Sequence, residues 1–204
     1  MIKTIYGIEE NNHKQLFEQM FELRADQFKR RRKWSVKVTN GQERDYFDEL
    51  NPLYVMVVTQ ERDLLASVRL LPTTGPHMLA DIFPELMGNE DIIRHPLIWE
   101  SSRFCINPNL CESRFKDGTN QVTRTLLKGT FEVAQQAGMH QIVSVADLMV
   151  EKILKRSGCS VERIGQLYHY DGLATVAGLC DVSPETIYSI CEGIEYDWQS
   201  TVPS

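Results

Sequence analysis

Two arginines of this chain lie in segments that otherwise have the pattern of buried structure. Arg24 follows Phe17 and Phe21 by seven and three residues, so it shares their face of a predicted helix. Arg69 interrupts the apolar run LLASVRLL. A buried charge is costly unless another charge or a hydrogen bond compensates it. Both arginines therefore need acidic partners in the folded protein.

Candidate partners occur in two other segments. The acidic run ERDYFDEL contains Asp45 and Asp48, and the apolar segment WESSRF contains Glu100 together with a third arginine, Arg103. These charges could form internal ion pairs that only stabilise the fold. They could also form a site for a zwitterionic ligand, because arginine clamps a carboxylate with two hydrogen bonds and a carboxylate holds an ammonium group. The number of charges that need explaining favours a binding site.

A run of five basic residues, KRRRK, lies between Phe28 and Trp34, although the chain has a net charge of -6. The two aromatic rings could offer their faces to a cationic ligand. The basic run itself could be a solvated surface, could balance the acidic run that follows, or could attract an acidic protein partner. An acidic chain with no other basic feature of this kind is not expected to bind nucleic acid.

The composition is that of an ordinary globular protein, with 42% hydrophobic and 25% charged residues. Its 204 residues suit a single domain spanning 1–204. The apolar runs are far shorter than the ~20 residues that a membrane span needs, and the N-terminal segment has no secretory-signal pattern. The five cysteines include no CxxC pair, which argues against a disulfide framework and a zinc site. We therefore expect a cytoplasmic protein that uses neither a metal nor a membrane.

Hydrophobic periodicity and turn residues predict the elements that position these charges. From the N-terminus they are a helix over 12–28 capped by Asn11 or Asn12, a long irregular loop over 29–51, a hairpin of strands 53–60 and 64–71, a short helical stretch over 78–86, a strand over 98–106, a helix over 119–137, a strand over 141–145, a helix over 147–157, strands over 161–166 and 168–180, and a final helix over 184–191. This order predicts an α/β sandwich with a mixed sheet.

Several of these segments together resemble one family, the acyl-homoserine lactone synthases (autoinducer synthases) of bacterial quorum sensing. The resemblance rests on LRADQFKRRRKW, ERDYFD, SVRLLPTTGPHML, IFPEL and WESSRF, which follow one another between residues 23 and 105. It continues more weakly to about Gly165. It implies a fold like that of the GNAT N-acetyltransferases, which is an α-β-α sandwich with a mixed, partly splayed central sheet.

The resemblance also implies a reaction. An acyl thioester, carried on acyl carrier protein or possibly on CoA, acylates the amine of S-adenosylmethionine, and lactonisation then releases methylthioadenosine. S-adenosylmethionine is a substrate in this reaction, and no cofactor is implied. The positions that the resemblance assigns to the site carry the expected residue types: Arg24, Phe28, Trp34, Asp45, Asp48, Arg69, Phe83, Glu100 and Arg103.

Glu100 is the candidate base in this reaction, either directly or through a water molecule, with Ser102 or a backbone carbonyl as the alternative. A free α-amine has a pKa of about 7.7–8.0, so a modest base is sufficient. In the lactonisation step the leaving group is already a cation, so positioning should matter more than proton transfer. Glu100 and Arg103 would point to opposite faces of a regular strand, and both can serve one site only if the strand bulges or splays.

The acyl chain needs an apolar pocket, and a carrier protein needs a docking surface. We expect the pocket along the strand and helix after residue 140, from Gln141, Ile142, Ser144, Val145, Leu148 and Met149, with Leu173 nearby. Family members that prefer 3-oxo chains tend to carry threonine in this strand, where Gln141 and Ser144 are the nearest counterparts. Lys152, Lys155 and Arg156 share one helix face and are the expected dock for an acidic acyl carrier protein, although an ordinary exposed face would look the same.

Two other functions are possible. An acetyl-CoA-dependent N-acetyltransferase of related fold would need an RxxGxG/A turn before its main helix, and the segment ESRFKDGTNQV (112–122) lacks that pattern. An acyl-homoserine lactone synthase could nevertheless use a CoA-linked acyl donor. A binding module without catalysis would not need Glu100.

Overall fold

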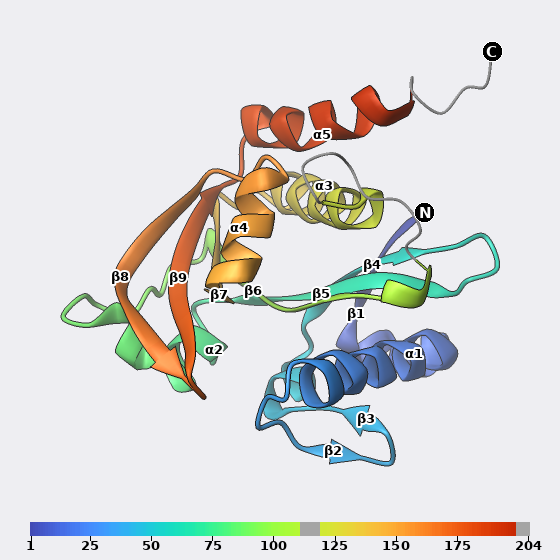
Figure 1. Cartoon of the computed structure of the whole chain (residues 1–204), viewed down its shortest axis with the longest axis horizontal. Coiled ribbons are helices and arrows are strands. Elements are labelled where there is room, and N and C mark those ends of the chain that lie inside the picture. The colour runs from blue at the N-terminus through green and yellow to red at the C-terminus, as the bar shows by residue number, and fades with distance from the viewer. Residues whose placement is uncertain (111–118, 199–204) are drawn as a thin grey trace.

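The computed structural model describes residues 1–110 and 119–198, and in this part of the chain one seven-stranded sheet forms the centre of the molecule (Figure 1). Its strands, in spatial order, are β1 (Ile2–Tyr6), β4 (Leu53–Val58), β5 (Leu64–Pro72), β6 (Ile98–Ile106), β7 (Gln141–Asp147), β9 (Leu173–Asp181) and β8 (Val161–Tyr170). Strands β6 and β7 are parallel and all other neighbours are antiparallel, so the mixed sheet is confirmed.

Helices cover both faces of the sheet. They are α1 (Lys14–Arg24), α2 (Met78–Asp81), α3 (Gln121–Gln136), α4 (Leu148–Arg156) and α5 (Pro184–Trp198). Figure 1 shows α1 and the small hairpin of β2 (Val38–Thr39) and β3 (Gln42–Glu43) on one side of β4–β6, with α3 and α5 on the other. The phenylalanine face of α1 packs on β4 through Phe17, Phe21 and Tyr54. The expected α-β-α sandwich is therefore present.

The first helix differs from its prediction at both ends. A 3-10 helix, η1 (Gly7–His13), precedes α1, and His13 rather than an asparagine occupies the N-cap without a side-chain hydrogen bond. At its other end α1 continues into a π-helix, η2 (Ala25–Arg31). The wider turns of a π-helix occur most often at functional sites, and this one carries the predicted site residue Phe28.

The expected irregular loop after this helix is largely ordered. It contains the β2–β3 hairpin and a 3-10 helix, η3 (Tyr46–Leu50). Asp45 caps η3 by accepting a hydrogen bond from the N–H of Phe47 at 3.0 Å, and Asp48 accepts one from the N–H of Asp45 at 2.8 Å. The two predicted acidic residues thus fix the local backbone as well as their own side chains.

The sheet splays between β6 and β7. Their pairing covers only Ile98–Ser101 against Gln141–Ser144, after which β6 stays with β5 and β7 stays with β9. Beyond this point the side-chain amide of Gln27 satisfies the open edge of β6. It donates to the carbonyl of Phe104 at 2.8 Å and accepts from the N–H of Ile106 at 3.2 Å. The splay implied by the resemblance is confirmed.

The remaining predictions hold with shifted boundaries. The strands at 53–60, 64–71 and 98–106 and the helices at 119–137 and 147–157 are present, and the last two strands form a hairpin. Strand β1 was not predicted, and α5 is longer than expected. Most of ESRFKDGTNQV lies outside the described residues. No helix within 1–110 and 119–198 is long and apolar enough to span a membrane.

Candidate active site

Arg24 lies at the C-terminal end of α1 and is completely buried. Its Nε donates to Glu43 Oε2 at 2.6 Å, while Nη1 and Nη2 donate to the two carboxylate oxygens of Asp48 at 2.7 and 2.9 Å. Its guanidinium carbon lies 5.1 Å from the ring centroid of Phe21. Arg24 therefore belongs to the aromatic face, as the spacing predicts, and its charge is fully paired there.

Arg69 lies within β5, and its side chain reaches the same carboxylates from the sheet. Its Nη1 donates to Asp45 Oδ1 at 2.5 Å and to Asp48 Oδ1 at 2.8 Å, and its Nε donates to the hydroxyl of Ser102 at 3.1 Å. The thioether sulfur of Met78 lies 3.3 Å from Nη2. Asp48 therefore joins the end of α1 to the middle of the sheet.

Arg103 joins the same network because β6 bulges. The pairing register of β5 with β6 shifts between Ser67 and Arg69, and Arg103 has a φ of 55°. One extra residue in a strand re-aims the side chains after it. As a result Nη2 of Arg103 lies 3.0 Å from Glu43 Oε1 and 2.6 Å from Asp45 Oδ2. The geometric condition for Glu100 and Arg103 to share a site is met.

These side chains form one ion-pair network, made of Arg24, Arg69 and Arg103 with Glu43, Asp45 and Asp48. Its three positive and three negative charges cancel. Burial by itself would raise the pKa of Asp48, but Arg24 and Arg69 outweigh burial and hold that pKa well below its usual range. Asp48 therefore stays an ion-paired carboxylate and is not the proton acceptor of the site.

Glu100 is separate from this network. Its carboxylate is fully buried and accepts hydrogen bonds from the N–H groups of Met78 at 2.8 Å and Leu79 at 2.6 Å, at the start of α2. Burial raises the pKa of Glu100, and the two N–H groups oppose this effect only in part. The prediction that Glu100 could pair with an arginine is wrong. A carboxylate with a raised pKa is a stronger base than an ordinary one.

The predicted aromatic residues form two contacts at the site. The rings of Phe28 and Trp34 stack on one another, with centroids 5.1 Å apart and planes 10° apart. Phe83 meets Tyr170 edge to face with centroids 4.9 Å apart, which ties the segment after α2 to the β8–β9 hairpin. Phe28 and Trp34 cover one another, and two cations already lie over these rings. The guanidinium carbon of Arg103 lies 5.3 Å from the Phe28 centroid and that of Arg32 lies 5.3 Å from the Trp34 centroid.

A cavity of about 410 Å³ lies against these groups and fills the splay between β6 and β7. One end is polar, with Asp45, Glu100, Ser102 and Arg103 in its wall, and Phe28, Trp34 and Phe83 beside them. The other end is apolar and is formed by Leu127, Phe131, Leu154, Cys159 and Cys180. Arg24, Asp48 and Arg69 are not in the wall. They lie behind it and hold the lining residues in place.

The residues predicted for the acyl pocket divide between the cavity wall and the surface. Ile142, Ser144, Val145 and Leu173 line the cavity, but Gln141, Leu148 and Met149 do not. The Gln141 amide donates to Asp181 at 2.8 Å at the end of the strand. Asp147 caps α4 at its first turn, which directs Leu148 and Met149 to the surface, where 39% and 65% of their areas are exposed.

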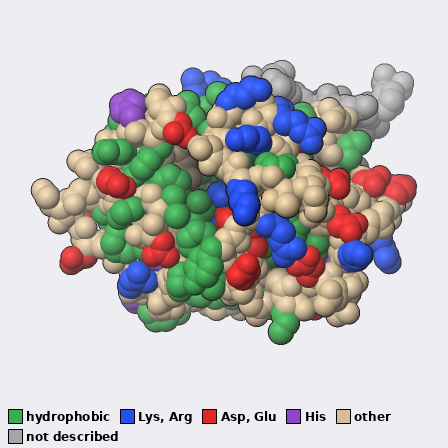
Figure 2. All heavy atoms as spheres, turned by 90° about the horizontal axis from the view of Figure 1, so that it is seen from below, with side chains coloured by type: hydrophobic (Ala, Val, Ile, Leu, Met, Phe, Trp, Pro, Cys, Tyr) green, Lys and Arg blue, Asp and Glu red, His purple; other side chains and the backbone are tan. Residues whose placement is uncertain are grey.

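The side chains of the predicted carrier dock are all exposed on α4. Lys155 pairs with Glu151 at 2.9 Å, and Glu151 also holds Arg163 of β8 at 2.7 Å. Hydrogen bonding from Arg163 and then from Lys155 lowers the pKa of Glu151 to about 2. Figure 2 shows the molecule from below, where hydrophobic side chains gather beside a row of lysines and arginines.

The basic run after Phe28 divides into two groups. Arg30 and Arg31 pair with Asp26 on the surface of η2, at 3.7 and 2.9 Å. Arg32 instead forms an ion pair with Asp147 and lies over the ring of Trp34, with its guanidinium carbon 5.3 Å from the centroid. The run therefore has both solvated members and one member at the cavity.

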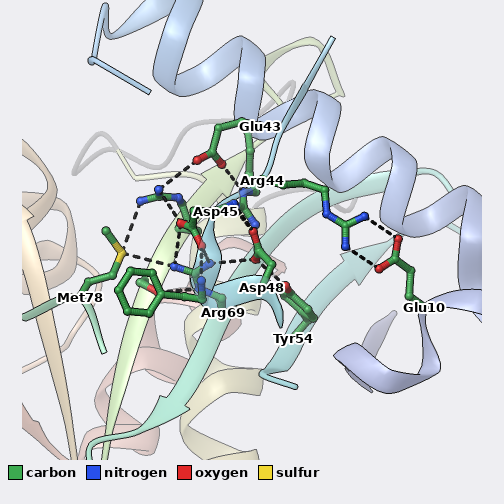
Figure 3. Close-up of polar contacts among 12 residues, drawn as sticks. Glu10, Glu43, Arg44, Asp45, Asp48, Tyr54, Arg69 and Met78 are labelled. Carbon is green, nitrogen blue, oxygen red and sulfur yellow. Dashed lines mark hydrogen bonds and ion pairs between the residues drawn. The ribbon is translucent and has the colours of Figure 1, made fainter. Parts of the chain in front are cut away.

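Two residues of the site, Tyr54 and Glu43, were not predicted from the sequence. Glu43 is the one for which the sequence has a signal. It lies two residues before Asp45 in an extended segment, and alternate residues of such a segment point to the same side. Arg44, between them, points away and pairs with Glu10 at 2.8 Å (Figure 3). The alternation in ERD was therefore an available signal. Tyr54, whose hydroxyl donates to Asp48 at 2.6 Å, had no such signal.

Comparisons with known proteins agree with this geometry. The model of the autoinducer synthase family matches residues 8–190. A probable acyl-homoserine-lactone synthase of Sinorhizobium fredii is 37% identical over 84% of this chain and 83% of its own length. The solved structure of BjaI, a CoA-dependent acyl-homoserine lactone synthase with S-adenosylmethionine and isopentyl-CoA, has a TM-score of 0.84 and 25% identity over 96% of this chain and 89% of its own.

One solved structure of lower sequence identity is similar to this chain in its fold. The crystal structure of a putative N-acetyltransferase from Lactobacillus plantarum has a TM-score of 0.58 to this chain at 18% identity. The match covers 89% of this chain and 99% of that one. The expected GNAT-like fold is thereby confirmed. On the family match and on the site that its residues build, the chain belongs to the autoinducer synthase family, the acyl-homoserine lactone synthases.

Proposed function

We propose that the chain acylates the amine of S-adenosylmethionine with an acyl thioester and closes the product to an N-acyl homoserine lactone. The observation that carries this proposal is the cavity, whose polar end contains a base and whose other end is apolar. S-adenosylmethionine has a net charge of +1, from a sulfonium, an ammonium and a carboxylate. The ion-pair network is neutral, and Glu100 in its carboxylate form adds the negative charge that complements this cation.

Two unsatisfied donors support a place for the substrate carboxylate. Among the described residues, nothing accepts a hydrogen bond from Arg103 Nε or from Trp34 Nε1, although both atoms are buried beside the cavity. A buried donor without a partner costs free energy, which a bound acceptor recovers. The carboxylate of S-adenosylmethionine would meet Arg103 and Trp34, and Asp45 would meet its ammonium group. Phe83, Phe28 and Trp34 would enclose the remaining part of S-adenosylmethionine.

Glu100 would then act as the base. It takes a proton from the ammonium group, directly or through a water molecule, and the free amine attacks the thioester carbonyl. The carbon–sulfur bond breaks and the carrier leaves as its thiol. Ser102, whose hydroxyl accepts from Arg69, is the alternative proton acceptor. Lactonisation follows when the substrate carboxylate attacks the carbon next to the sulfonium, and methylthioadenosine leaves.

The acyl chain would occupy the apolar end of the cavity. Ser144 lines the cavity and is hydrogen-bonded through its hydroxyl to that of Ser101. This pair could turn toward a polar substituent on the chain, although neither residue is a threonine. Leu154 and Cys180 would contact the end of the chain. The volume and apolar lining favour a flexible acyl group over an acetyl group, and therefore the synthase over an acetyl-CoA-dependent N-acetyltransferase.

The donor is an acyl thioester whose carrier is acyl carrier protein or CoA. The structures of MesI and BjaI are described as those of CoA-dependent synthases, which supports CoA as a donor. The exposed basic face of Lys152, Lys155 and Arg156 supports an acidic carrier protein. Charge reversal at Lys152, which forms no ion pair with a described residue, would discriminate the two because it should impair only transfer from the protein carrier.

The direct test is mass spectrometry of spent medium from a host that expresses the chain, followed by assays of purified protein. S-adenosylmethionine and a panel of acyl-carrier and acyl-CoA thioesters should give methylthioadenosine and a lactone in equal amounts. Acetyl transfer from acetyl-CoA to other amines, without methylthioadenosine, would instead establish the N-acetyltransferase. Binding of S-adenosylmethionine without turnover of any thioester would leave only a binding module.

A further inference from the structure

Arg32 and Asp147 connect two parts of the chain that are 115 residues apart, and they meet at the cavity. Arg32 follows the π-helix η2, and Asp147 is the last residue of β7. Nη1 of Arg32 donates to Asp147 Oδ2, and both side chains belong to the cavity wall. Their exposed fractions are 22% and 9%, so the pair lies at the boundary between cavity and solvent.

The pair crosses the opening of the splayed sheet. On one side η2 is attached to the open edge of β6, because Gln27 pairs with Phe104 and Ile106. On the other side Asp147 ends β7 after that strand has separated from β6. The ion pair therefore connects the β6 side to the end of β7 across the stretch where these two strands no longer pair.

The two ends of the pair differ in how firmly they are held. Asp147 Oδ1 accepts hydrogen bonds from the N–H groups of Met149 at 2.9 Å and Val150 at 2.8 Å, so this carboxylate is fixed as the N-cap of α4. Arg32 precedes Lys33, which has a φ of 60°. Arg32 carries its guanidinium on a long side chain with several rotatable bonds, and that group lies over the ring of Trp34. Opening therefore requires Arg32 to move and leaves α4 unchanged.

We propose that the Arg32–Asp147 pair is a gate for the acyl donor, which opens to admit the thioester and closes over it. This inference rests on the proposed function. With its acyl chain at Leu154 and its carbonyl at Glu100, a linear thioester has to leave the cavity through the opening between β6 and β7. S-adenosylmethionine, at the polar end beside Asp45, does not need that opening.

The test compares variants that break the ion pair by replacing either Asp147 or Arg32. Asp147→Asn removes the charge and keeps the N-cap, because asparagine caps as well as aspartate. Arg32→Gln removes the cation. Arg32→Lys keeps the pair, and Arg30→Gln removes an exposed cation that meets only Asp26. The donor is an acyl-N-acetylcysteamine thioester, which has no charge and no phosphate, so carrier docking does not contribute.

Asp147→Asn and Arg32→Gln should each raise kcat/KM for this donor several-fold, leave KM for S-adenosylmethionine unchanged, and add nothing to one another in the double variant. Arg32→Lys and Arg30→Gln should behave as wild type.

Two results would overturn the gate. Unchanged donor kcat/KM in both folded single variants would mean that the pair does not limit entry. A loss confined to Arg32→Gln and to phosphate-bearing donors such as acyl-CoA would mean that Arg32 binds the donor instead. Failure of the proposed function is a separate result, since wild type would then form no methylthioadenosine with any thioester.

Discussion

Arg24 holds Asp48 with two parallel hydrogen bonds, Nη1 to Oδ1 at 2.7 Å and Nη2 to Oδ2 at 2.9 Å, and each side chain is only 1% exposed. Asp48 also accepts from Arg69 and from the hydroxyl of Tyr54. A carboxylate with these partners cannot be replaced by a neutral group without leaving cations unpaired in the interior.

Replacing Asp48 with alanine should lower the free energy of unfolding by about 3–5 kcal/mol, the cost of stranding a buried charge. Urea denaturation measures this change. The control is Glu10→Gln, which breaks the bidentate but exposed pair with Arg44 and should cost at most about 1 kcal/mol. Equal effects of the two substitutions would show that burial does not set the strength of the Asp48 network.

The stability of the protein should depend on pH through Asp48. The pKa of this carboxyl is lowered in the folded state, so its contribution is present above the usual aspartate pKa of about 3.9 and is lost as the pH falls below it. Denaturation measured from about pH 5 down to pH 3 should therefore show a steeper loss for wild type than for Asp48→Asn. Identical slopes would contradict the lowered pKa.

Glu100→Gln should reduce kcat by about 10²–10⁴-fold, the usual size of general-base catalysis. KM for S-adenosylmethionine should change little. Wild-type activity should rise with pH through a pKa above the usual glutamate value, because burial raises the pKa of Glu100, and this limb should be missing in the variant. The amide would also lose one backbone contact, to Met78 or Leu79. A fall in melting temperature with an unaltered pH profile would indicate that Glu100 only anchors α2.

Filling the apolar end of the cavity should shorten the acyl chain of the product. Leu154→Phe adds volume at that end, and a mixture of acyl donors analysed by mass spectrometry should then give shorter lactones than wild type. Met149→Phe adds a similar volume outside the cavity, where 65% of the methionine is exposed, and should leave the product distribution unchanged. The same distribution from both variants and wild type would place the acyl chain elsewhere.

Arg103 allows backbone strain to be separated from ligand binding. At a φ of 55° an alanine is less favourable than a glycine by about 1–2 kcal/mol, so Arg103→Gly should be the more stable of the two variants by that amount. Both variants lack the guanidinium and should raise KM for S-adenosylmethionine alike. Wild-type KM in the folded glycine variant would remove Arg103 from the binding site.

The existence of the ion-pair network could be predicted from charges that interrupt apolar periods, as Arg24 and Arg69 do. Which carboxylate each arginine meets could not, because that depends on how α1 and β5 approach one another. Glu100 illustrates the limit. Its burial was evident from WESSRF, but its partners are backbone groups of Met78 and Leu79, which have no side-chain signature.

Periodicity also fails where the backbone changes its repeat. The spacing of Phe17 and Phe21 predicts the buried face of α1 correctly, but the π-helix after Arg24 has a wider turn. The orientation of Arg32 was therefore outside any α-helical pattern. Leu148 and Met149 were misplaced for a related reason, because the cap at Asp147 begins a helix and ends the alternation of β7.

The side chain of Gln27 has a consequence for the thermodynamics of ligand binding. By occupying the carbonyl of Phe104 and the N–H of Ile106, it replaces the hydrogen bonds that a neighbouring strand would make. The two strands are therefore parted at this point while the carbonyl of Phe104 and the N–H of Ile106 keep hydrogen-bond partners. A ligand therefore does not have to separate two hydrogen-bonded strands, and this one cost is not subtracted from its binding free energy.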